Sequence, residues 1–320
     1  MTLTFFKLGA FGFISGPTLT SDGVGNAGLL DQRAALQWTK DYISLVGGNP
    51  AAITAMGESA GAGSIMHHLV AQGGTLDPIF TKAVMQSPAF EPLYDPGRLL
   101  LQYQIFEKTA GCGGKGLACL RSASTTALQT ANKKTINNTP YGTFGYGPSV
   151  DGSFIRDIPG LEMARGNYWK NVKVMAGHTS YEGIVFTDPS INTESEITTT
   201  IQRNFPNATA ATRNLIQNEL YPKPGFLGLF TEFSTNFERL STIIQDFIIN
   251  CNVLTYTPPC PYLASVLTWL FLLPGTLDSR SLPRKILDLR ILRRSWHPRL
   301  RPLRHLLAHR PQHRPAPNRL

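Results

Sequence analysis

The sequence has no uninterrupted apolar run of the roughly 18 residues that a membrane-spanning helix needs. Its longest candidate, residues 262–274, is too short and is interrupted by polar residues and proline. The first residues lack the basic start and the clear cleavage site of a secretory signal peptide. We therefore expect no transmembrane helix, and no signal peptide is visible in the chain.

Motifs for metal and nucleotide binding are also missing. The 320 residues include four cysteines, none in a CxxC pair, and contain no HExxH sequence and no glycine-rich phosphate loop. These motifs carry much of the zinc, redox and phosphate chemistry of proteins. The sequence therefore gives no reason to expect a metal ion or a cofactor.

Acidic residues are scarce only towards the carboxyl end. Residues 1–250 hold 18 Lys and Arg against 19 Asp and Glu, whereas residues 251–320 hold 12 against 2. Beyond Asp288 the chain repeats Arg, Pro, His and Leu, and such a segment cannot build a packed face. We predict a folded domain at 1–254 and a disordered basic tail at 255–320. The tail lacks the interleaved aromatic residues of nucleic-acid readers, so we expect no specific nucleic-acid binding.

The first 250 residues alternate short apolar segments with longer helical patterns, which is typical of a parallel sheet flanked by helices. We expect strands at residues 5–13, 51–56, 82–86 and 172–176. Helical patterns cover residues 27–45, 62–72, 194–220 and 231–250. In the first of these helices, the residues expected to face inward are Leu29, Ala34, Leu36, Trp38 and Ile43.

The sequence Gly57-Glu58-Ser59-Ala60-Gly61 matches G-x-S-x-G, which places a serine on a sharp turn between a strand and a helix. Gly57 and Gly61 give the strained backbone the space it needs. The Ala60 N–H, at the positive end of the helix, can stabilise a developing oxyanion. Such a pentapeptide also recurs by chance, but the predicted strand before it and helix after it favour Ser59 as a nucleophile.

Around this turn the sequence resembles the type B carboxylesterase family, which includes cholinesterases and fungal lipases. Segments 8–13, 26–38 and 47–50 and the serine turn follow in the family's order and spacing, and the similarity runs over residues 5–254. The resemblance implies an incomplete α/β-hydrolase fold with a mostly parallel sheet. It also implies hydrolysis of a small-molecule or lipid ester through an acyl group carried on Ser59.

Two further features are implied by the resemblance. Glu182, in the sequence from Gly177 to Gly183, is the expected acid that orients the histidine base, and the alternative is an ordinary loop carboxylate. Cys112 and Cys119 match a family disulfide, and the alternative is two free thiols. Glycosylation sequons at Asn137 and Asn207, taken with a disulfide, point to a secreted parent protein.

The histidine base itself has no clear candidate. The family places it in a loop well after residue 250, where this chain has only the histidines of its basic tail, at positions 297, 305, 309 and 313. His67 and His68 are expected to be surface or packing residues of the helix that follows Ser59, and His178 to be a loop residue. The family's second oxyanion donor lies upstream of the segment that starts this chain.

We therefore expect a chain truncated at both ends, with impaired ester hydrolysis. Two other interpretations stay open, a non-catalytic interaction protein of the same fold and a truncated product that does not fold stably. Neither the natural ester nor the oligomeric state follows from the sequence.

Overall fold

The computed structural model of this chain describes residues 6–16, 19, 23–89, 93–224 and 233–255. Its contacts divide the chain into the units Met1–Pro274 and Gly275–Leu320, and every described residue belongs to the first unit. The predicted disordered tail lies outside the described residues from position 256 onward.

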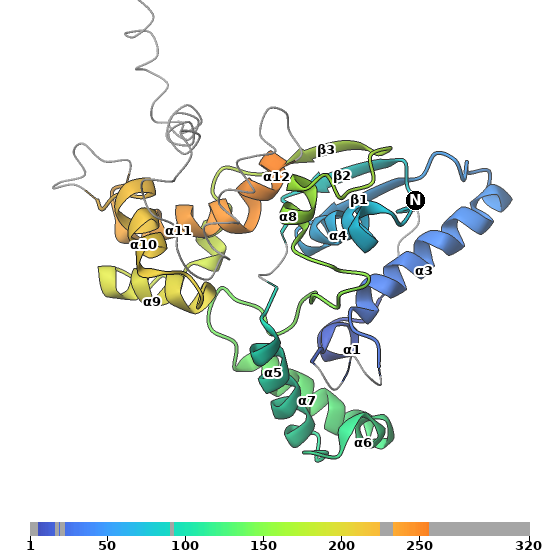
Figure 1. Cartoon of the computed structure of the whole chain (residues 1–320), viewed down its shortest axis with the longest axis horizontal. Helices are drawn as coiled ribbons and strands as arrows, with labels where there is room; N and C mark the ends of the chain where they lie inside the picture. The colour runs from blue at the N-terminus through green and yellow to red at the C-terminus, as the bar shows by residue number, and fades with distance from the viewer. Residues whose placement is uncertain (1–5, 17–18, 20–22, 90–92, 225–232, 256–320) are drawn as a thin grey trace, which may run out of the picture. The chain divides into compact units, whose positions relative to one another are not determined.

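A parallel sheet of three strands carries the fold. The strands are β1 (Thr54–Glu58), β2 (Lys82–Gln86) and β3 (Lys173–Gly177), and they lie in the order β1-β2-β3 (Figure 1). Their pairing aligns the last residue of each strand, so the three carboxyl ends meet at one edge. The strands predicted at 51–56, 82–86 and 172–176 are confirmed, with ends that shift by at most three residues.

The helix α4 (Ala60–Gly74) covers one face of this sheet (Figure 1). Its inward stripe repeats at the three- and four-residue spacing of an amphipathic helix. The stripe consists of Ala62, Ile65, Met66 and Leu69, which form one buried cluster with Ala55, Ala83 and Met85 of the strands. Apolar burial between α4 and the sheet therefore holds the strand–turn–helix unit together.

The opposite face of the sheet is open to solvent within the described residues. Met56 of β1 is 67% exposed, and Met175 of β3 is 64% exposed. Parallel sheets normally have both faces covered. The described part of the chain thus forms one layer of helices on a sheet whose second face is uncovered.

The helix predicted at 27–45 is confirmed as α3 (Ala27–Tyr42), continued by the 3₁₀ turn η1 (Ile43–Val46). Leu29 is fully buried as expected, whereas Leu36 and Ile43 are only partly buried. The expectation is wrong for Ala34, which is exposed, and for Trp38, which is 58% exposed. The described chain packs mainly against the start of α3, so the apolar stripe continues beyond its packing partners.

The strand predicted at 5–13 is wrong for its described part. Ala10–Phe13 is the short helix α1, and residues 6–8 have no regular structure. Gly9 turns the chain at a positive φ of 56°, and the Ala10 N–H donates to Asn132 Oδ1 at 2.8 Å. The Asn132 side chain, more than a hundred residues away, thus accepts a hydrogen bond from the first N–H of α1. The local sequence pattern gives no sign of this contact.

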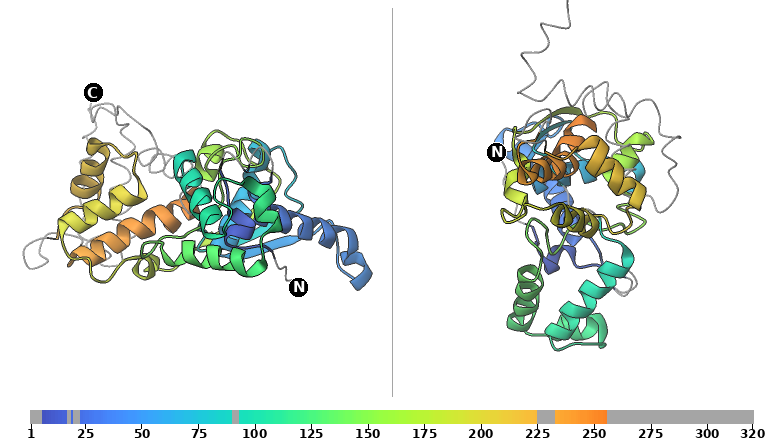
Figure 2. Two further views of the ribbon diagram at one scale, coloured as in Figure 1. Left: turned by 90° about the horizontal axis from the view of Figure 1, so that it is seen from below. Right: turned by 90° about the vertical axis from the view of Figure 1, so that its left-hand side faces the viewer.

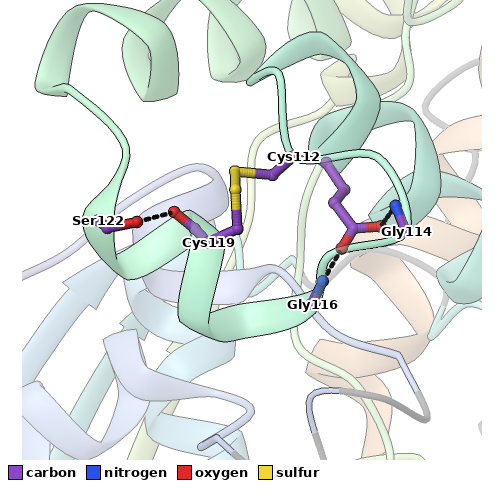
Figure 3. Close-up of a disulfide and its surroundings, with 6 residues drawn as sticks. Cys112, Gly114, Gly116, Cys119 and Ser122 are labelled. Carbon is purple, nitrogen blue, oxygen red and sulfur yellow. Dashed lines mark hydrogen bonds between the residues drawn. A yellow bond between two sulfur atoms is a disulfide. The ribbon is translucent and has the colours of Figure 1, made fainter.

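Helices α5 (Pro96–Thr109) and α7 (Thr125–Asn137) lie side by side (Figure 2), and α6 (Gly116–Ser122) connects them. The predicted disulfide Cys112–Cys119 is present in this connection (Figure 3). The buried carboxylate of Glu107 accepts hydrogen bonds from the N–H groups of Gly114 at 3.0 Å and Gly116 at 2.6 Å. The loop is therefore closed both covalently and by a carboxylate.

The described region from Glu194 onwards is mainly helical, as predicted for residues 194–220 and for the described part of 231–250. It follows the short helix α8 (Pro159–Ala164) and the 3₁₀ turn η2 (Glu182–Phe186). The elements are α9 (Glu194–Asn204), α10 (Ala210–Asn214), η3 (Leu215–Leu220), α11 (Asn236–Gln245), η5 (Asp246–Asn250) and α12 (Cys251–Thr255) (Figure 2).

A buried arginine joins three of these elements. Arg239 of α11 is completely buried and donates to the carbonyls of Tyr221 at 2.7 Å and Gln217 at 2.5 Å. It also donates to the Glu194 carboxylate of α9 at 2.5 Å. All three nitrogens of the guanidinium group thus donate hydrogen bonds, as a buried charge requires.

Replacing Arg239→Met should lower the free energy of unfolding by about 3 kcal/mol, because two buried carbonyls and Glu194 lose their donor. Urea denaturation measures this change. Lys223→Met is the matched control, because Lys223 is exposed and lies 4.0 Å from the same Glu194, so it should change stability by less than about 0.5 kcal/mol. Equal effects of the two substitutions would contradict the assigned role of Arg239.

Replacing both Cys112→Ser and Cys119→Ser should lower the free energy of unfolding by about 2 kcal/mol or less. The disulfide closes only a short loop, and Glu107 continues to hold that loop when the disulfide is absent. Adding Glu107→Gln to the double variant should destabilise the protein further. If thermal unfolding shows no added loss, the carboxylate does not support the loop.

Candidate active site

The predicted nucleophile and acid lie at the same edge of the sheet. Ser59 directly follows β1, and Glu182 begins η2 in the loop that follows β3. Ser87 directly follows the central strand β2. Because the three parallel strands end in register, the fold brings these three segments to one edge although they are far apart in sequence.

Ser59 forms the corner between β1 and α4. Its backbone has φ 52° and ψ −123°, a conformation that costs a non-glycine residue about 1–3 kcal/mol. The corner is fixed on both sides: the Ser59 N–H donates to the Gln86 carbonyl at 2.9 Å, and the Ser59 carbonyl accepts from Gly63 at 2.9 Å and Ala89 at 3.2 Å. The residue is partly buried, so its hydroxyl is not enclosed in the core.

The two glycines of the turn have different environments. A Cβ added at Gly57 would lie 2.5 Å from the Gly61 carbonyl carbon and 2.7 Å from the Ala62 nitrogen, so only glycine allows this close approach. A Cβ added at Gly61 would meet no described atom within 4 Å. The steric requirement inferred from the motif is therefore visible at Gly57, while the described residues impose none at Gly61.

The other two residues of the turn flank the serine. Ala60 is the first residue of α4 and is exposed. The first N–H groups of a helix have no acceptor within the helix, which suits the Ala60 N–H to bind an anion. Glu58 ends β1 and is exposed, and its carboxylate makes no hydrogen bond to another described residue.

The Glu182 carboxylate is held by two donors. Its Oε1 atom accepts from the Ser87 hydroxyl at 2.5 Å and from the Thr179 N–H at 2.8 Å. Partial burial favours the neutral acid, but these hydrogen bonds, with His178 nearby, outweigh it and lower the pKa of Glu182. The group is thus a fixed carboxylate at neutral pH.

Ser87 is a site residue that the sequence analysis missed. It is buried, adopts a positive φ of 46°, and donates its N–H to the Gly177 carbonyl at 2.7 Å. Its hydroxyl points to Glu182. The available signal was its position directly after the strand predicted at 82–86, because polar residues at the carboxyl ends of neighbouring parallel strands lie at one edge.

None of the three described histidines is placed as a base for Ser59. His67 and His68 are buried in α4, and burial lowers the pKa of His67 to about 3 and that of His68 to about 4. His67 is roughly 12 Å along the helix from Ser59, at 1.5 Å per residue. His178 directs Nδ1 to the Thr179 carbonyl at 2.7 Å, which fits its expected loop role.

The described residues contain no cluster of three or more His, Cys, Asp or Glu that could hold a metal ion. Among the same residues, no helix has the length and apolar character to span a bilayer.

The parallel sheet, the strained serine corner and the carboxylate after the third strand define this chain as an α/β-hydrolase with a serine turn. Comparison with known proteins identifies the branch of that class. The model of the carboxylesterase family matches residues 4–270, and the chain belongs to this family.

Several proteins similar to this chain are fungal enzymes. The chain is 35% identical to a secreted lipase of Arthroderma benhamiae, over 79% of this chain and 48% of the relative. It is 34% identical to a carboxylesterase of Aspergillus clavatus, over 77% and 44% respectively. The crystal structure of Aspergillus niger EstA superimposes with a TM-score of 0.67 at 31% identity, covering 78% of this chain and 48% of EstA. The chain thus spans about half the length of the relatives it matches.

Replacing Ser87→Ala should raise the pKa of Glu182, because burial raises this pKa and one of the hydrogen bonds that lower it is lost. A lowered pKa stabilises the fold above the unfolded-state pKa and is lost as the pH falls through the folded-state value. The lowered pKa of Glu182 should therefore make the unmodified protein more stable than Ser87→Ala at pH 7. This part of the difference in the free energy of unfolding should vanish in acid. NMR titration of the labelled glutamate carboxyls measures the shift.

Ser190→Ala is the control, because its hydroxyl makes an equivalent bond to Asp188 at 2.7 Å, away from Glu182. It should leave the titration of Glu182 unchanged. An unchanged pKa in Ser87→Ala would show that the Ser87 hydroxyl does not hold the carboxylate.

Proposed function

We propose that this chain carries the nucleophile and the acid of a serine carboxylesterase site. Ser59 attacks the carbonyl carbon of a small-molecule or lipid ester, the alcohol leaves, and water releases the acid from the acyl-serine. Glu182 orients the histidine that transfers the protons, and the Ala60 N–H stabilises the oxyanion.

The strained corner at Ser59 is the observation that carries this proposal. A positive φ at a serine persists only where the surrounding structure enforces it, and such residues concentrate at active sites. The distance between the strands that carry Ser59 and Glu182 also supports the proposal. β1 and β3 flank β2, so roughly 10 Å separates their axes, a gap in which an imidazole can bond to Ser59 on one side and Glu182 on the other.

We assign no base among the described histidines, for the reasons given by their burial and contacts. The expected histidine of the family falls after residue 250 in sequence order, and the described residues end at 255. We propose that this chain alone hydrolyses esters poorly, because none of the described histidines is placed to take the proton of Ser59. A serine nucleophile without its general base loses several powers of ten in turnover.

The setting we propose is extracellular, as the name of the secreted Arthroderma lipase suggests. The disulfide supports an oxidising compartment. Asn137 and Asn207 are both exposed, so the two glycosylation sequons stay a prediction that the fold permits. We propose no specific nucleic-acid partner and assign no oligomeric state.

The uncovered sheet face favours one alternative, a truncated product of low stability. Met56 and Met175 expose apolar surface that parallel sheets normally bury. A single cooperative melting transition would argue against this alternative. The other alternative, a non-catalytic interaction protein, predicts that Ser59 has no special reactivity.

A fluorophosphonate probe tests the nucleophile. We expect slow labelling at Ser59, abolished by Ser59→Ala, and turnover of p-nitrophenyl butyrate far below that of ordinary esterases. Ser64→Ala is the matched control, because Ser64 lies on the same helix and donates to the Ala60 carbonyl at 2.9 Å. It should retain labelling.

Peptide mapping after labelling identifies the modified residue. Labelling of other serines in preference to Ser59 would refute the nucleophile assignment. Ordinary esterase turnover that Ser59→Ala abolishes would instead refute the proposed impairment and leave the nucleophile in place.

A further inference from the structure

Residues 87–89 form a short buried loop that touches both halves of the proposed site. At one end, Ser87 donates its N–H to Gly177 and its hydroxyl to Glu182, at 2.7 and 2.5 Å. At the other end, the Ala89 N–H donates to the Ser59 carbonyl at 3.2 Å. The 87–89 loop thus links the serine corner after β1 to the carboxylate after β3.

The middle of this loop is held from a different element. Pro88 has no N–H, so its carbonyl is the only backbone group through which it can be hydrogen-bonded. That carbonyl accepts from Asn252 Nδ2 of α12 at 2.9 Å. The contact is buried and joins residues 164 positions apart in sequence.

Both amide hydrogens of Asn252 are used. The second one donates to the Ile248 carbonyl at 2.6 Å, one turn earlier in the same helical segment, and the side chain is almost fully buried. This second bond fixes the rotamer that points the amide at Pro88. Asn252 is therefore oriented by its own helix before it meets the loop.

We propose that Asn252 is a positioning residue of the ester-hydrolysing site, which fixes the 87–89 loop and through it the relative placement of Ser59 and Glu182. The inference rests on the proposed function and extends it to a residue that touches neither reacting group.

The physical consequence follows from the bonding pattern. Without the Asn252 amide, the buried Pro88 carbonyl has no hydrogen-bond donor. A movement of the loop that exposes this carbonyl to water then lowers the free energy. Ser87 and Ala89 are its direct neighbours in the chain, so movement lengthens the bonds to Glu182 and to Ser59. Thr179 and His178 approach Glu182 from the β3 side and do not depend on this loop.

The test is a double-mutant cycle on the full chain, with the titration of the labelled Glu182 carboxyl as readout. The variants are Asn252→Ala, Ser87→Ala and both together. Asn252→Ser is a milder second variant, because its hydroxyl can still bond the Ile248 carbonyl but cannot reach Pro88. Asn204→Ala is the control, since the Asn204 amide makes the same kind of bond as Asn252 within its own helix, to the Thr200 carbonyl at 3.0 Å.

We expect Asn252→Ala and Asn252→Ser to raise the pKa of Glu182 and Asn204→Ala to leave it unchanged. Because Asn252 acts through Ser87, the double variant should titrate like Ser87→Ala alone. Amide exchange at Ala89 should be about tenfold faster in both Asn252 variants, as expected for one buried hydrogen bond lost.

Three outcomes overturn the proposal. An unchanged Glu182 titration in folded Asn252→Ser would show a purely structural role, and so would additive shifts in the double variant. Unchanged exchange at Ala89 would show that the loop is held without Asn252. These readouts need no turnover, so they stand apart from fluorophosphonate labelling, whose failure at Ser59 would refute the proposed function alone.

Discussion

The parallel, in-register pairing of β1, β2 and β3 is the constraint on which the site depends. It places the residues that follow each strand at one edge, where Ser87 donates to Glu182 and the Ser59 N–H donates to the end of β2. A shift of one residue in the register of β2 would move Ser87 out of reach of Glu182 and turn its side chain to the opposite face. The hydrogen bonds among the three turns therefore depend on the sheet, and α4 secures the sheet by apolar burial on one face.

Strain at this edge is balanced locally. Ser59 and Ser87 both adopt positive φ angles, and each is tied by its backbone to the neighbouring strand end. Gly57 lets the backbone of α4 approach β1 closely enough to form the first corner. The uncovered face with Met56 and Met175 shows the opposite situation, in which the described residues leave apolar surface without a partner.

Much of this arrangement could be predicted from sequence because its signals are local. The strands around residues 54–58, 82–86 and 173–177 and the serine turn have short-range patterns that match the structure. The failures share one cause. α1 was predicted as a strand and Trp38 as an inward residue, and in both cases contacts from distant segments, or their absence, decided the outcome. Ser87 was missed because its role exists only where two strand ends meet.

By itself, the sequence determined the strand–turn–helix unit around Ser59, because small residues at fixed spacing permit one backbone corner and the amphipathic stripe of the following helix buries it. The disulfide between Cys112 and Cys119 was implied only by the family resemblance, and the structure contains it. Only the tertiary structure decided that Ser87 donates to Glu182 and that Asn252 reaches Pro88, since these bonds join residues 95 and 164 positions apart. Contacts at that separation leave no periodic signal, because they depend on how the strands pair and where α12 packs.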